Sequence, residues 1–446
     1  MTTKPNLTRV WAETAPGANV VDPDTVTVGK FTAGWQAEVP PFEYFNFIQK
    51  QVTEGLAHIN EQGIAVWDQV TTYPVGGLAK GSDGNVYKAL TSQNNNDPVS
   101  DGGTNWKQTI DSIFANVVAF GATGGNPSVD QAAFEAAAAD GRSIYIPAPP
   151  SGQPYNLANW NPGPNKIVFG DGDDSKIILT AGNYGDTDEP NSVGALKPVN
   201  CPDLTIKDIH VDGNRSNVTG DDLLNLEAIN VDACDRVAII NCTTVNTVAD
   251  GIDIDNTADA YVSNCRGVDC GGYAVHHSIG SINPTTENCY AENCGFLRDR
   301  GAFDIFFLGT EGGKIMNNTA VNCNSGISVG PVTDSSIVTG NHIIDCEGDS
   351  IKVVNFVGQG QTGSGNSCLV SNNRVFNSLG RGIVVESNNV GVANNNITGG
   401  GGTASTTGLV IGGNKCRVIG NDVRFFSTNF DDNGTGTIDL GNNFVN

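Results

Sequence analysis

Short runs of alternating hydrophobic and polar residues recur along the second half of the chain. Clear examples are EAINVD (227–232), GIDID (251–255), AFDIFF (302–307) and GIVVE (382–386). A period of two is typical of a half-buried strand, in which successive side chains point to opposite faces. The pattern therefore predicts many short strands and few helices.

A turn of Asn and Cys residues recurs together with these strands and defines a repeat. Aligned turns place at their second position Cys242, Cys265, Cys289, Asn318, Asn341, Asn373, Asn396 and Asn421. A spacing of 23 to 32 residues indicates a solenoid. Because the segments alternate and lack helical spacing of apolar residues, each repeat is expected to form one coil of parallel strands, rising about 4.8 Å per coil.

The cysteines fit the same repeat. The chain has 11 of them, an odd number in a chain too long to need a disulfide framework. A second set lies five residues after the turn, at Cys270, Cys294, Cys323 and Cys346. We interpret both sets as small interior residues stacked from coil to coil, and since no CxxC pair occurs, no metal site is expected. The Asn column is predicted to hydrogen-bond turn backbone between coils.

Upstream segments carry a resemblance to a known fold. Residues 117–150 predict a strand, a glycine turn, a helix beginning near Ser128 and Val129, and a second strand. Together with KIVFGDGDDSKI (166–177) and DLTIKDIHVDGN (203–214), this resembles the first coils of pectate-lyase-like proteins. The resemblance implies a mainly β fold, a right-handed parallel β-helix over residues 111–446. That fold carries lyases, hydrolases and non-catalytic binders, so it does not specify the chemistry.

Two further segments precede the β-helix. Residues 1–64 contain one apolar helical stripe, too narrow to form a core alone, which either packs within the chain or mediates self-association. Residues 65–110 resemble a small chitin-binding-type carbohydrate module. Its aromatic positions are matched by Tyr73, Tyr87 and Trp106, which either stack on sugar or form the core of the module.

The N-terminus, MTTKPNLTRVW, lacks the apolar core of a secretory signal, and no run of 18 apolar residues occurs. An association segment, a small β module and a β-helix without a signal together resemble a bacteriophage tailspike. The resemblance implies a homotrimer, made in the host cytoplasm, that attaches to the virion tail or baseplate through its N-terminus. It also implies that the β-helix recognises bacterial surface polysaccharide.

The net charge limits the classes of partner that the chain is expected to bind. The net charge is −24, which would repel nucleic acid and anionic membranes, so neither is expected as a partner. No cofactor is expected. Acidic substrates are mildly disfavoured for the same reason.

The strand alignment predicts two outward columns in which acids gather on the early coils. The first reads Asn230, Asp253, Ala274, Asp304, Ser328, Lys352, Val384, Val410 and Asp439. The second, two residues further on, reads Asp232, Asp255, His276, Phe306, Gly330, Val354, Glu386 and Gly412. Ala274 would then leave a gap between two acids, and His277 would point inward.

Glycoside hydrolysis requires one carboxylic acid and one carboxylate. Asp253 and Asp304 are two coils apart, about 9.6 Å between backbones, and the inverting reaction uses carboxyl groups about 6.5 to 9.5 Å apart. Asp255 is expected beside His276, where the pair would hold a sugar hydroxyl or tune an acid. Crowded aspartates also favour one that keeps its proton. The alternative is a solvated acidic wall.

Further candidates surround these acids. NTVADGIDID (246–255) resembles the Asn-Thr-Asp-Gly motif of polygalacturonases, which implies a catalytic role for Asp250. Two residues intrude in that motif, and the other polygalacturonase motifs are missing. The substrate-binding candidates are His276, Arg298, Arg300, Lys352, Phe306 and Glu386.

Three functions remain open. The first is a glycoside hydrolase that degrades capsule or O-antigen polysaccharide, with Asp253 and Asp304 as acid and base. The second is a lyase that uses His276 or Lys352 as the proton acceptor. The third is a spike that binds polysaccharide without cleaving it.

Overall fold

The structure is a computed structural model of the 446-residue chain. It describes residues 49–50, 52, 64, 66–82, 85–92, 96–101, 103–109, 113–187, 191–220, 225–297, 300–305, 310, 312–330, 335–354, 367–400, 406–441 and 444–445. The chain divides into two compact units, residues 1–112 and 113–446. Most of the apolar stripe predicted within residues 1–64 lies outside the described residues.

The first unit contains a small antiparallel sheet of β1 (Leu78–Lys80), β2 (Val86–Ala89) and β3 (Trp106–Gln108). Trp106 of β3 is buried and meets Tyr73 edge to face, with ring centroids 5.0 Å apart. Tyr87 is half-buried and packs against the same cluster. Two of the three aromatic residues that matched a carbohydrate module therefore form its core.

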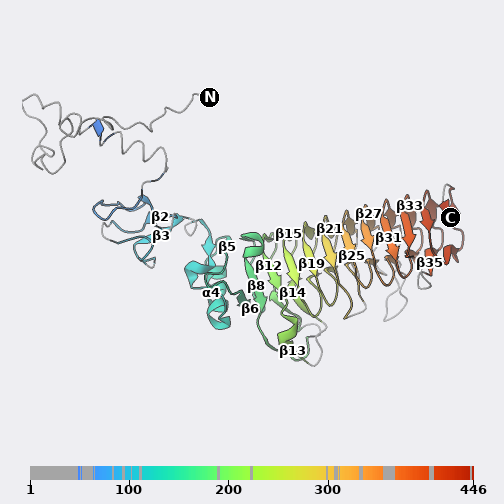
Figure 1. Ribbon diagram of the computed structural model, residues 1–446, viewed down its shortest axis with the longest axis horizontal. Helices are drawn as coiled ribbons and strands as arrows, with labels where there is room; N and C mark the ends of the chain where they lie inside the picture. The colour runs from blue at the N-terminus through green and yellow to red at the C-terminus, as the bar shows by residue number, and fades with distance from the viewer. Residues whose placement is uncertain are drawn as a thin grey trace, which may run out of the picture. The chain divides into compact units, whose positions relative to one another are not determined.

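The second unit is a stack of coils built from three parallel sheets (Figure 1). Sheet 1 has ten strands: β10 (Val193–Leu196), β14 (Leu226–Asp232), β17 (Ile252–Asp255), β20 (Val275–His277), β23 (Phe303–Ile305), β26 (Ile327–Val329), β29 (Ile351–Val353), β32 (Ile383–Val385), β35 (Thr407–Ile411) and β38 (Thr428–Asp432).

Sheet 2 has thirteen strands: β4 (Ala115–Asn116), β5 (Ile144–Ile146), β7 (Ile167–Gly170), β11 (Thr205–Lys207), β15 (Ala238–Ile240), β18 (Tyr261–Ser263), β21 (Thr285–Glu287), β24 (Lys314–Met316), β27 (Ile337–Thr339), β30 (Leu369–Ser371), β33 (Gly391–Ala393), β36 (Arg417–Ile419) and β39 (Ile438–Asp439).

Sheet 3 has twelve strands: β6 (Tyr155–Leu157), β8 (Lys176–Leu179), β12 (His210–Asp212), β16 (Thr243–Val245), β19 (Arg266–Val268), β22 (Tyr290–Glu292), β25 (Thr319–Val321), β28 (His342–Ile344), β31 (Arg374–Ser378), β34 (Asn396–Gly399), β37 (Asp422–Arg424) and β40 (Phe444–Val445). A coil passes through sheets 1, 2 and 3 in turn, so each strand pairs with the strand one coil later. The prediction of one coil per repeat is confirmed.

A helix closes the first coils. α4 (Pro127–Ala139) begins one residue before Ser128, because the side chain of Asn126 accepts the backbone N–H of Val129 and caps it. Phe134 of this helix packs edge to face against Trp160, and the indole N–H donates to the carbonyl of Phe134 at 3.1 Å. The apolar end of the tube is thereby covered.

Short elements complete this unit: η3 (Val117–Phe120), η4 (Gly172–Asp174), η5 (Arg215–Asn217), and a two-stranded sheet of β9 (Gly182–Asn183) and β13 (Val218–Thr219).

The frequent Asn-Cys pairs are explained by the turn between sheets 2 and 3. Asn241, Asn264 and Asn288 each adopt a positive φ, between 52° and 55°, in the left-handed region that Asn tolerates better than most residues. The residue after each of them points into the tube. Small Cys242, Cys265 and Cys289 occupy that interior position, as predicted.

In later coils an asparagine ladder replaces these thiols. The Oδ1 of Asn341 accepts the N–H of Asn318 at 2.9 Å, and its Nδ2 donates to the carbonyl of Ile315 at 2.9 Å. The same pattern runs from Cys289 to Asn421. The ladder confirms hydrogen bonding between coils, with one correction. Its fourth asparagine is buried Asn395 and not exposed Asn396, which belongs to β34.

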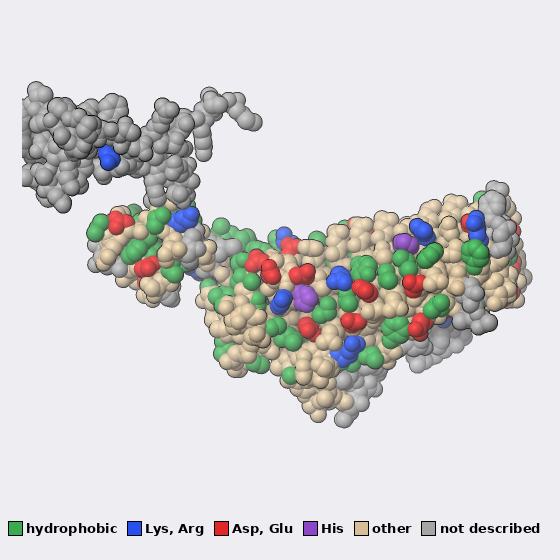
Figure 2. All heavy atoms as spheres, viewed as in Figure 1, with side chains coloured by type: hydrophobic (Ala, Val, Ile, Leu, Met, Phe, Trp, Pro, Cys, Tyr) green, Lys and Arg blue, Asp and Glu red, His purple; other side chains and the backbone are tan. Residues whose placement is uncertain are grey.

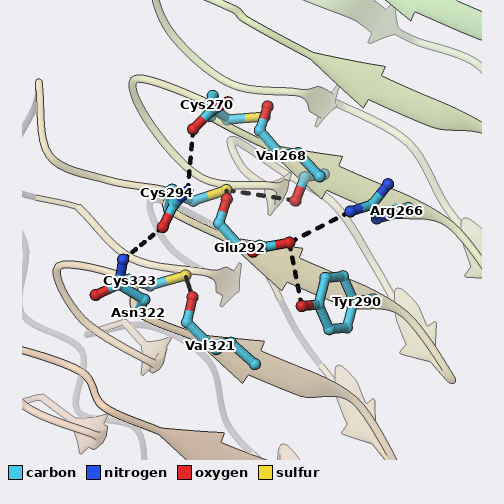
Figure 3. A network of polar contacts seen from close by, with 12 residues as sticks. Arg266, Val268, Cys270, Tyr290, Glu292, Cys294, Val321, Asn322 and Cys323 are labelled. Carbon is cyan, nitrogen blue, oxygen red and sulfur yellow. Dashed lines mark hydrogen bonds and ion pairs between the residues drawn. The ribbon is translucent and has the colours of Figure 1, made fainter.

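The second cysteine set forms a similar stack, visible in Figure 3 as Cys270, Cys294 and Cys323 in consecutive coils. The Sγ of Cys294 donates to the carbonyl of Glu292 at 3.4 Å, and Cys323 repeats this contact with Val321 at 3.5 Å. All 11 cysteines are buried and free of disulfides. The thiols therefore act as interior packing, as the sequence predicted.

The outer surface carries charges of both signs. Figure 2 shows Asp and Glu side chains interspersed with Lys and Arg over strands of sheets 2 and 3, without a stripe of one sign on that face. Within the described ranges, no helix has the length and hydrophobicity needed to span a membrane.

Candidate active site

Three neighbouring strands of sheet 1 bring the candidate acids together. In the register of β17, β20 and β23, Asp253 lies opposite His276, and His276 lies opposite Asp304. Ile252 and Ile254, which flank Asp253, are buried in the core of the tube, so Asp253 points to the opposite face of the strand. The predicted column is therefore present, with Asp253 and Asp304 two coils apart.

The rung between the two acids was predicted wrongly. His276, not Ala274, occupies it, because β20 begins only at Val275. Ala274 lies in the preceding turn and packs closely against Gly267. A Cβ added to Gly267 would lie only 2.5 Å from the Cβ of Ala274. The predicted gap between the acids is filled by an imidazole ring.

The imidazole of His276 contacts three carboxylates. Its Nδ1 lies 3.1 Å from Oδ2 of Asp250 and 3.2 Å from Oδ1 of Asp253, and its Nε2 lies 3.4 Å from Oδ2 of Asp304. All four side chains are nearly inaccessible, at most 7% exposed. This row of Asp250, Asp253, His276 and Asp304 is called the acid–histidine cluster below.

Asp255 was predicted to pair with His276, and this is wrong. Asp255 lies opposite Asp232 on β14, and on β20 it is Ile254 that faces His277. His276 belongs to the Asp253 column instead. Asp439 is also misplaced in the prediction, because β39 belongs to sheet 2, while Asp431 of β38 lies opposite Val410. His277 points inward, as predicted, and its Nε2 lies 2.8 Å from Oγ1 of Thr286.

Asp250 orients the imidazole. Its carboxylate accepts the backbone N–H of Tyr273 as well as contacting His276. Burial alone would raise the pKa of Asp250, but the hydrogen bond and charge of His276 and the charge of Arg300 outweigh it and lower this pKa. Asp250 therefore stays ionised at neutral pH.

The same contacts set the charge of His276. Burial alone would lower its pKa, but the hydrogen bonds to Asp250 and Asp253 and their negative charges raise it well above the usual value. His276 is therefore an imidazolium at neutral pH, with both ring nitrogens protonated. Its Nδ1 faces the carboxylates of Asp250 and Asp253, and its Nε2 faces Asp304.

Asp304 is the acid that retains its proton. Burial raises its pKa to about 7, although the positive charges of His276 and Arg300 oppose the shift. Both members of the column lie on fully buried strands. They differ in that Asp253 also accepts a hydrogen bond from Nδ2 of Asn230 at 3.3 Å.

Tyr273 and Arg300 complete the site. The Tyr273 ring lies 5.1 Å from the His276 ring, and the Arg300 guanidinium lies 5.4 Å above the same tyrosine ring. The charges of Asp250, Tyr273, Asp304 and Asp253 together outweigh burial and raise the pKa of Arg300. Arg300 was predicted as a substrate-binding residue, whereas Tyr273 was missed. The repeat could have identified Tyr273, because it places Tyr273 one coil after Asp250.

A chain of hydrogen bonds steadies Asp253 from the other side. Lys197 donates from Nζ to Oγ of Ser192 at 3.0 Å, and that hydroxyl donates to Oδ1 of Asn230 at 3.4 Å. Asn230 then donates to Asp253. These residues lie one and two coils before Asp253 and were not identified as site residues from the sequence, apart from the position of Asn230 in the column.

The remaining candidates lie apart from the cluster. Lys352 is two coils beyond Asp304, and its Nζ lies 3.9 Å from Oδ2 of Asp349. Glu386 is exposed after the end of β32. Arg298 and Phe306 lie outside the described residues.

One group in the cluster has the composition of a metal site. Ligand atoms of Asp250, Asp253 and His276 lie within 4.8 Å of one another. Two carboxylates and an imidazole suit a divalent cation. In this arrangement Nδ1 of His276 contacts both carboxylates, and the positive charge of Arg300 acts on the same site.

Comparisons with known proteins support the fold. A family model described as "Right handed beta helix region" matches residues 227–357. The fold is thus a right-handed parallel β-helix, as predicted. A search of curated proteins finds no match.

Solved structures with the same fold include a glucanase and a phage tailspike. The catalytic domain of a GH87 α-1,3-glucanase in complex with nigerose has a TM-score of 0.54 and 16% identity, over 72% of this chain and 68% of that one. A tailspike protein variant of E. coli bacteriophage HK620 has a TM-score of 0.52 and 17% identity, over 76% of this chain and 65% of that one. At these identities the likeness shows the fold alone.

Proposed function

We propose that this β-helix binds a bacterial surface polysaccharide and hydrolyses it with inversion at the anomeric carbon. The observation that carries the proposal is the row of Asp253, His276 and Asp304. Since the two nitrogens of an imidazole are about 2.2 Å apart, the contacts of 3.2 and 3.4 Å place the carboxyl oxygens at most about 9 Å apart. An inverting pair requires about 6.5 to 9.5 Å, whereas a retaining pair requires about 5 Å.

Asp304 has the protonation state that a general acid requires. Asp304, with a pKa of about 7, holds a proton that it donates to the glycosidic oxygen as the bond to the anomeric carbon breaks. Asp253 accepts a proton from the water that attacks that carbon on the opposite face. Asp304 leaves the step ionised and Asp253 protonated, and exchange with solvent restores both.

The other residues position this pair. The His276 imidazolium lies between the acids and separates their charges, and Asp250 keeps that ring protonated and oriented. Asn230 holds the Asp253 carboxylate. Arg300 and Tyr273 cover the ring and limit access of water.

A lyase on this scaffold receives less support. A lyase base must accept a proton, but His276 already carries a proton on both nitrogens. Lys352, the other candidate base, lies apart from the cluster, two coils beyond Asp304 and next to Asp349.

A second function, binding without cleavage, is favoured by one observation. Every charged side chain of the cluster is at most 7% exposed, and such a network also serves to hold neighbouring strands in register. In that function the cluster is structural, and the polysaccharide contacts other surface groups.

The tailspike role, with a homotrimer attached to the virion through the N-terminal segment, is part of the same proposal. It is supported by the order of the chain's segments and by the likeness of fold to a phage tailspike. Sedimentation of the full chain tests it, since a mass near three times 46.5 kDa is expected.

A direct assay separates the three functions. The full chain is incubated with purified capsular and O-antigen polysaccharides, and both reducing ends and ultraviolet absorbance of unsaturated sugars are followed. New reducing ends without absorbance indicate hydrolysis, and both signals together indicate a lyase. Retention of a polysaccharide without either signal indicates binding only.

A further inference from the structure

A polar hollow lies on sheet 2, beside the coils that carry the acid–histidine cluster. Its volume is about 510 Å³, within the range of about 300 to 1,000 Å³ typical of ligand sites. It is lined by Asp259, Ala260, Tyr261, Asn283, Thr285, Gly312 and Lys314. None of these residues belongs to the cluster.

Three neighbouring strands shape the hollow. Tyr261 of β18 lies opposite Thr285 of β21, and Thr285 lies opposite Lys314 of β24. A small threonine between two long side chains leaves a notch, and since each coil rises about 4.8 Å, its two sides are about 9.6 Å apart. The hollow therefore results from the small side chain of Thr285 at this position of the coil.

The turn before these strands forms the rim. Asn283 donates from Nδ2 to Oδ1 of Asp259 at 3.3 Å, and both residues adopt a positive φ. Gly312 takes the same place in the next coil, where a Cβ would lie 2.6 Å from Oδ1 of Asn283. The absence of a side chain at Gly312 keeps this edge open.

The lining has the chemistry of a sugar-binding surface. Tyr261 supplies a partly exposed aromatic ring whose hydroxyl contacts Glu287. Asp259 and Asn283 supply acceptors and amide donors. Lys314 supplies an exposed ammonium that forms no ion pair with any other described residue. A ring for stacking, with a carboxylate, an amide and an ammonium around it, matches the hydroxyl groups of a neutral sugar.

The position of the hollow links it to the cluster. β17, β20 and β23 of sheet 1 carry the cluster, and each leads directly into β18, β21 or β24 of sheet 2. Asp255 at the end of β17 is separated from Asp259 at the rim by only three residues. A polysaccharide chain bound over the cluster could therefore continue across this turn.

We propose that the hollow is an accessory subsite for a neutral hexopyranose unit of the polysaccharide that the cluster cleaves. This rests on the proposed function for its polymer, but it predicts binding at residues that take no part in the chemistry. Its contribution is to hold long chains, so it acts on affinity rather than on bond cleavage.

The probe is an array of purified bacterial capsular polysaccharides and O-antigen chains, incubated with the full chain carrying Asp304→Asn to prevent cleavage. Thr285→Trp fills the notch from a half-buried surface position of a strand. Thr319→Trp, at a half-buried position of β25 on sheet 3, is the matched control. Lys314→Met is a second variant that removes an exposed group and leaves the backbone unchanged, and circular dichroism checks the fold of each protein.

The expected result is an affinity for retained polysaccharides that falls about three- to tenfold in Thr285→Trp and in Lys314→Met, and is unchanged in Thr319→Trp. Equal affinities in all four proteins, or no retained polysaccharide at all, would overturn the subsite. Cleavage by the parent chain together with equal affinities would overturn the subsite alone. Weakened binding without cleavage by the parent chain would support the subsite and overturn the hydrolysis.

Discussion

His276 and Asp304 face each other across adjacent coils, with Nε2 of the imidazole 3.4 Å from Oδ2 of the carboxyl group. The contact joins residues 28 positions apart in the chain, and it exists because β20 and β23 pair in parallel with His276 opposite Asp304. It links a group that stays protonated to an acid whose pKa is about 7. The cluster's chemistry follows from that relationship.

Replacement of Asp304 by Asn removes the proposed proton donor. The turnover of polysaccharide is expected to fall by about 10² to 10⁴, the usual contribution of general acid catalysis. Reducing-end release measures it, and Asp349→Asn, on the same face but beside Lys352, is a control that should retain activity. Full turnover in Asp304→Asn would remove Asp304 from the mechanism.

The same replacement should stabilise the fold at neutral pH. The folded pKa of Asp304 is about 7, above the ordinary value of 3.8, so as pH rises from about 4 to 7 the unfolded state loses its proton first. The free energy of unfolding of the parent chain therefore falls over that window. The difference in free energy of unfolding between Asp304→Asn and the parent chain should shift in favour of the variant by up to about 4 kcal/mol between pH 4 and pH 8. Chemical denaturation at the two pH values measures it. An equal effect at both pH values would contradict the raised pKa.

Arg300 controls the upper limit of the active pH range. Its charge opposes the rise in the pKa of Asp304, so Arg300→Gln should raise that pKa further. Activity, which requires protonated Asp304, should then persist to higher pH than in the parent. Arg266→Gln, which breaks the exposed pair with Glu292 seen in Figure 3, is the control and should leave the pH profile unchanged.

His276→Gln should be strongly destabilising, because it leaves three buried carboxylates without the imidazolium between them. A loss of about 3 to 5 kcal/mol is expected at pH 8, as for removal of one partner from a buried ion pair. The loss should shrink at pH 4, where Asp304, with its pKa of about 7, is protonated and carries no charge. Combining the change with Asp304→Asn should recover part of the stability, and a strictly additive double variant would argue against direct coupling.

Asn395 and Asn396 provide an internal test of the asparagine ladder. Asn395→Ala removes a buried amide that accepts from Asn373 and donates to the carbonyl of Val370, which should cost about 2 to 3 kcal/mol. Exposed Asn396→Ala should cost less than about 0.5 kcal/mol. Thermal unfolding compares the two, and similar costs would refute the assignment of Asn395 to the ladder.

The sequence predicted the fold because the solenoid repeats its signal in every coil. Alternating strands and Asn-Cys turns gave the coil spacing, the interior thiols and the shared column of Asp253 and Asp304. The same reasoning failed at one strand. Aligning Gly272 with Gly251 shifted that strand by two residues and placed Ala274 where His276 lies, whereas the register pairs Ile252 with Val275.

Burial was the second feature that the sequence did not reveal. Alternation predicted outward columns of acids, with a solvated wall as the alternative, but the cluster is buried and covered by Tyr273 and Arg300. Those residues precede β20 and β23 and contact the cluster only because turns from successive coils stack above it. Charge states therefore depend on contacts that no single repeat contains.

The most direct test of the central claim follows the anomeric protons of the first product by NMR during cleavage of a susceptible polysaccharide. Separation of Asp253 and Asp304 by the His276 ring predicts that the new reducing end first appears with the anomeric configuration opposite to that of the cleaved linkage. A product that first appears with the configuration retained would contradict the assignment of this pair as acid and base.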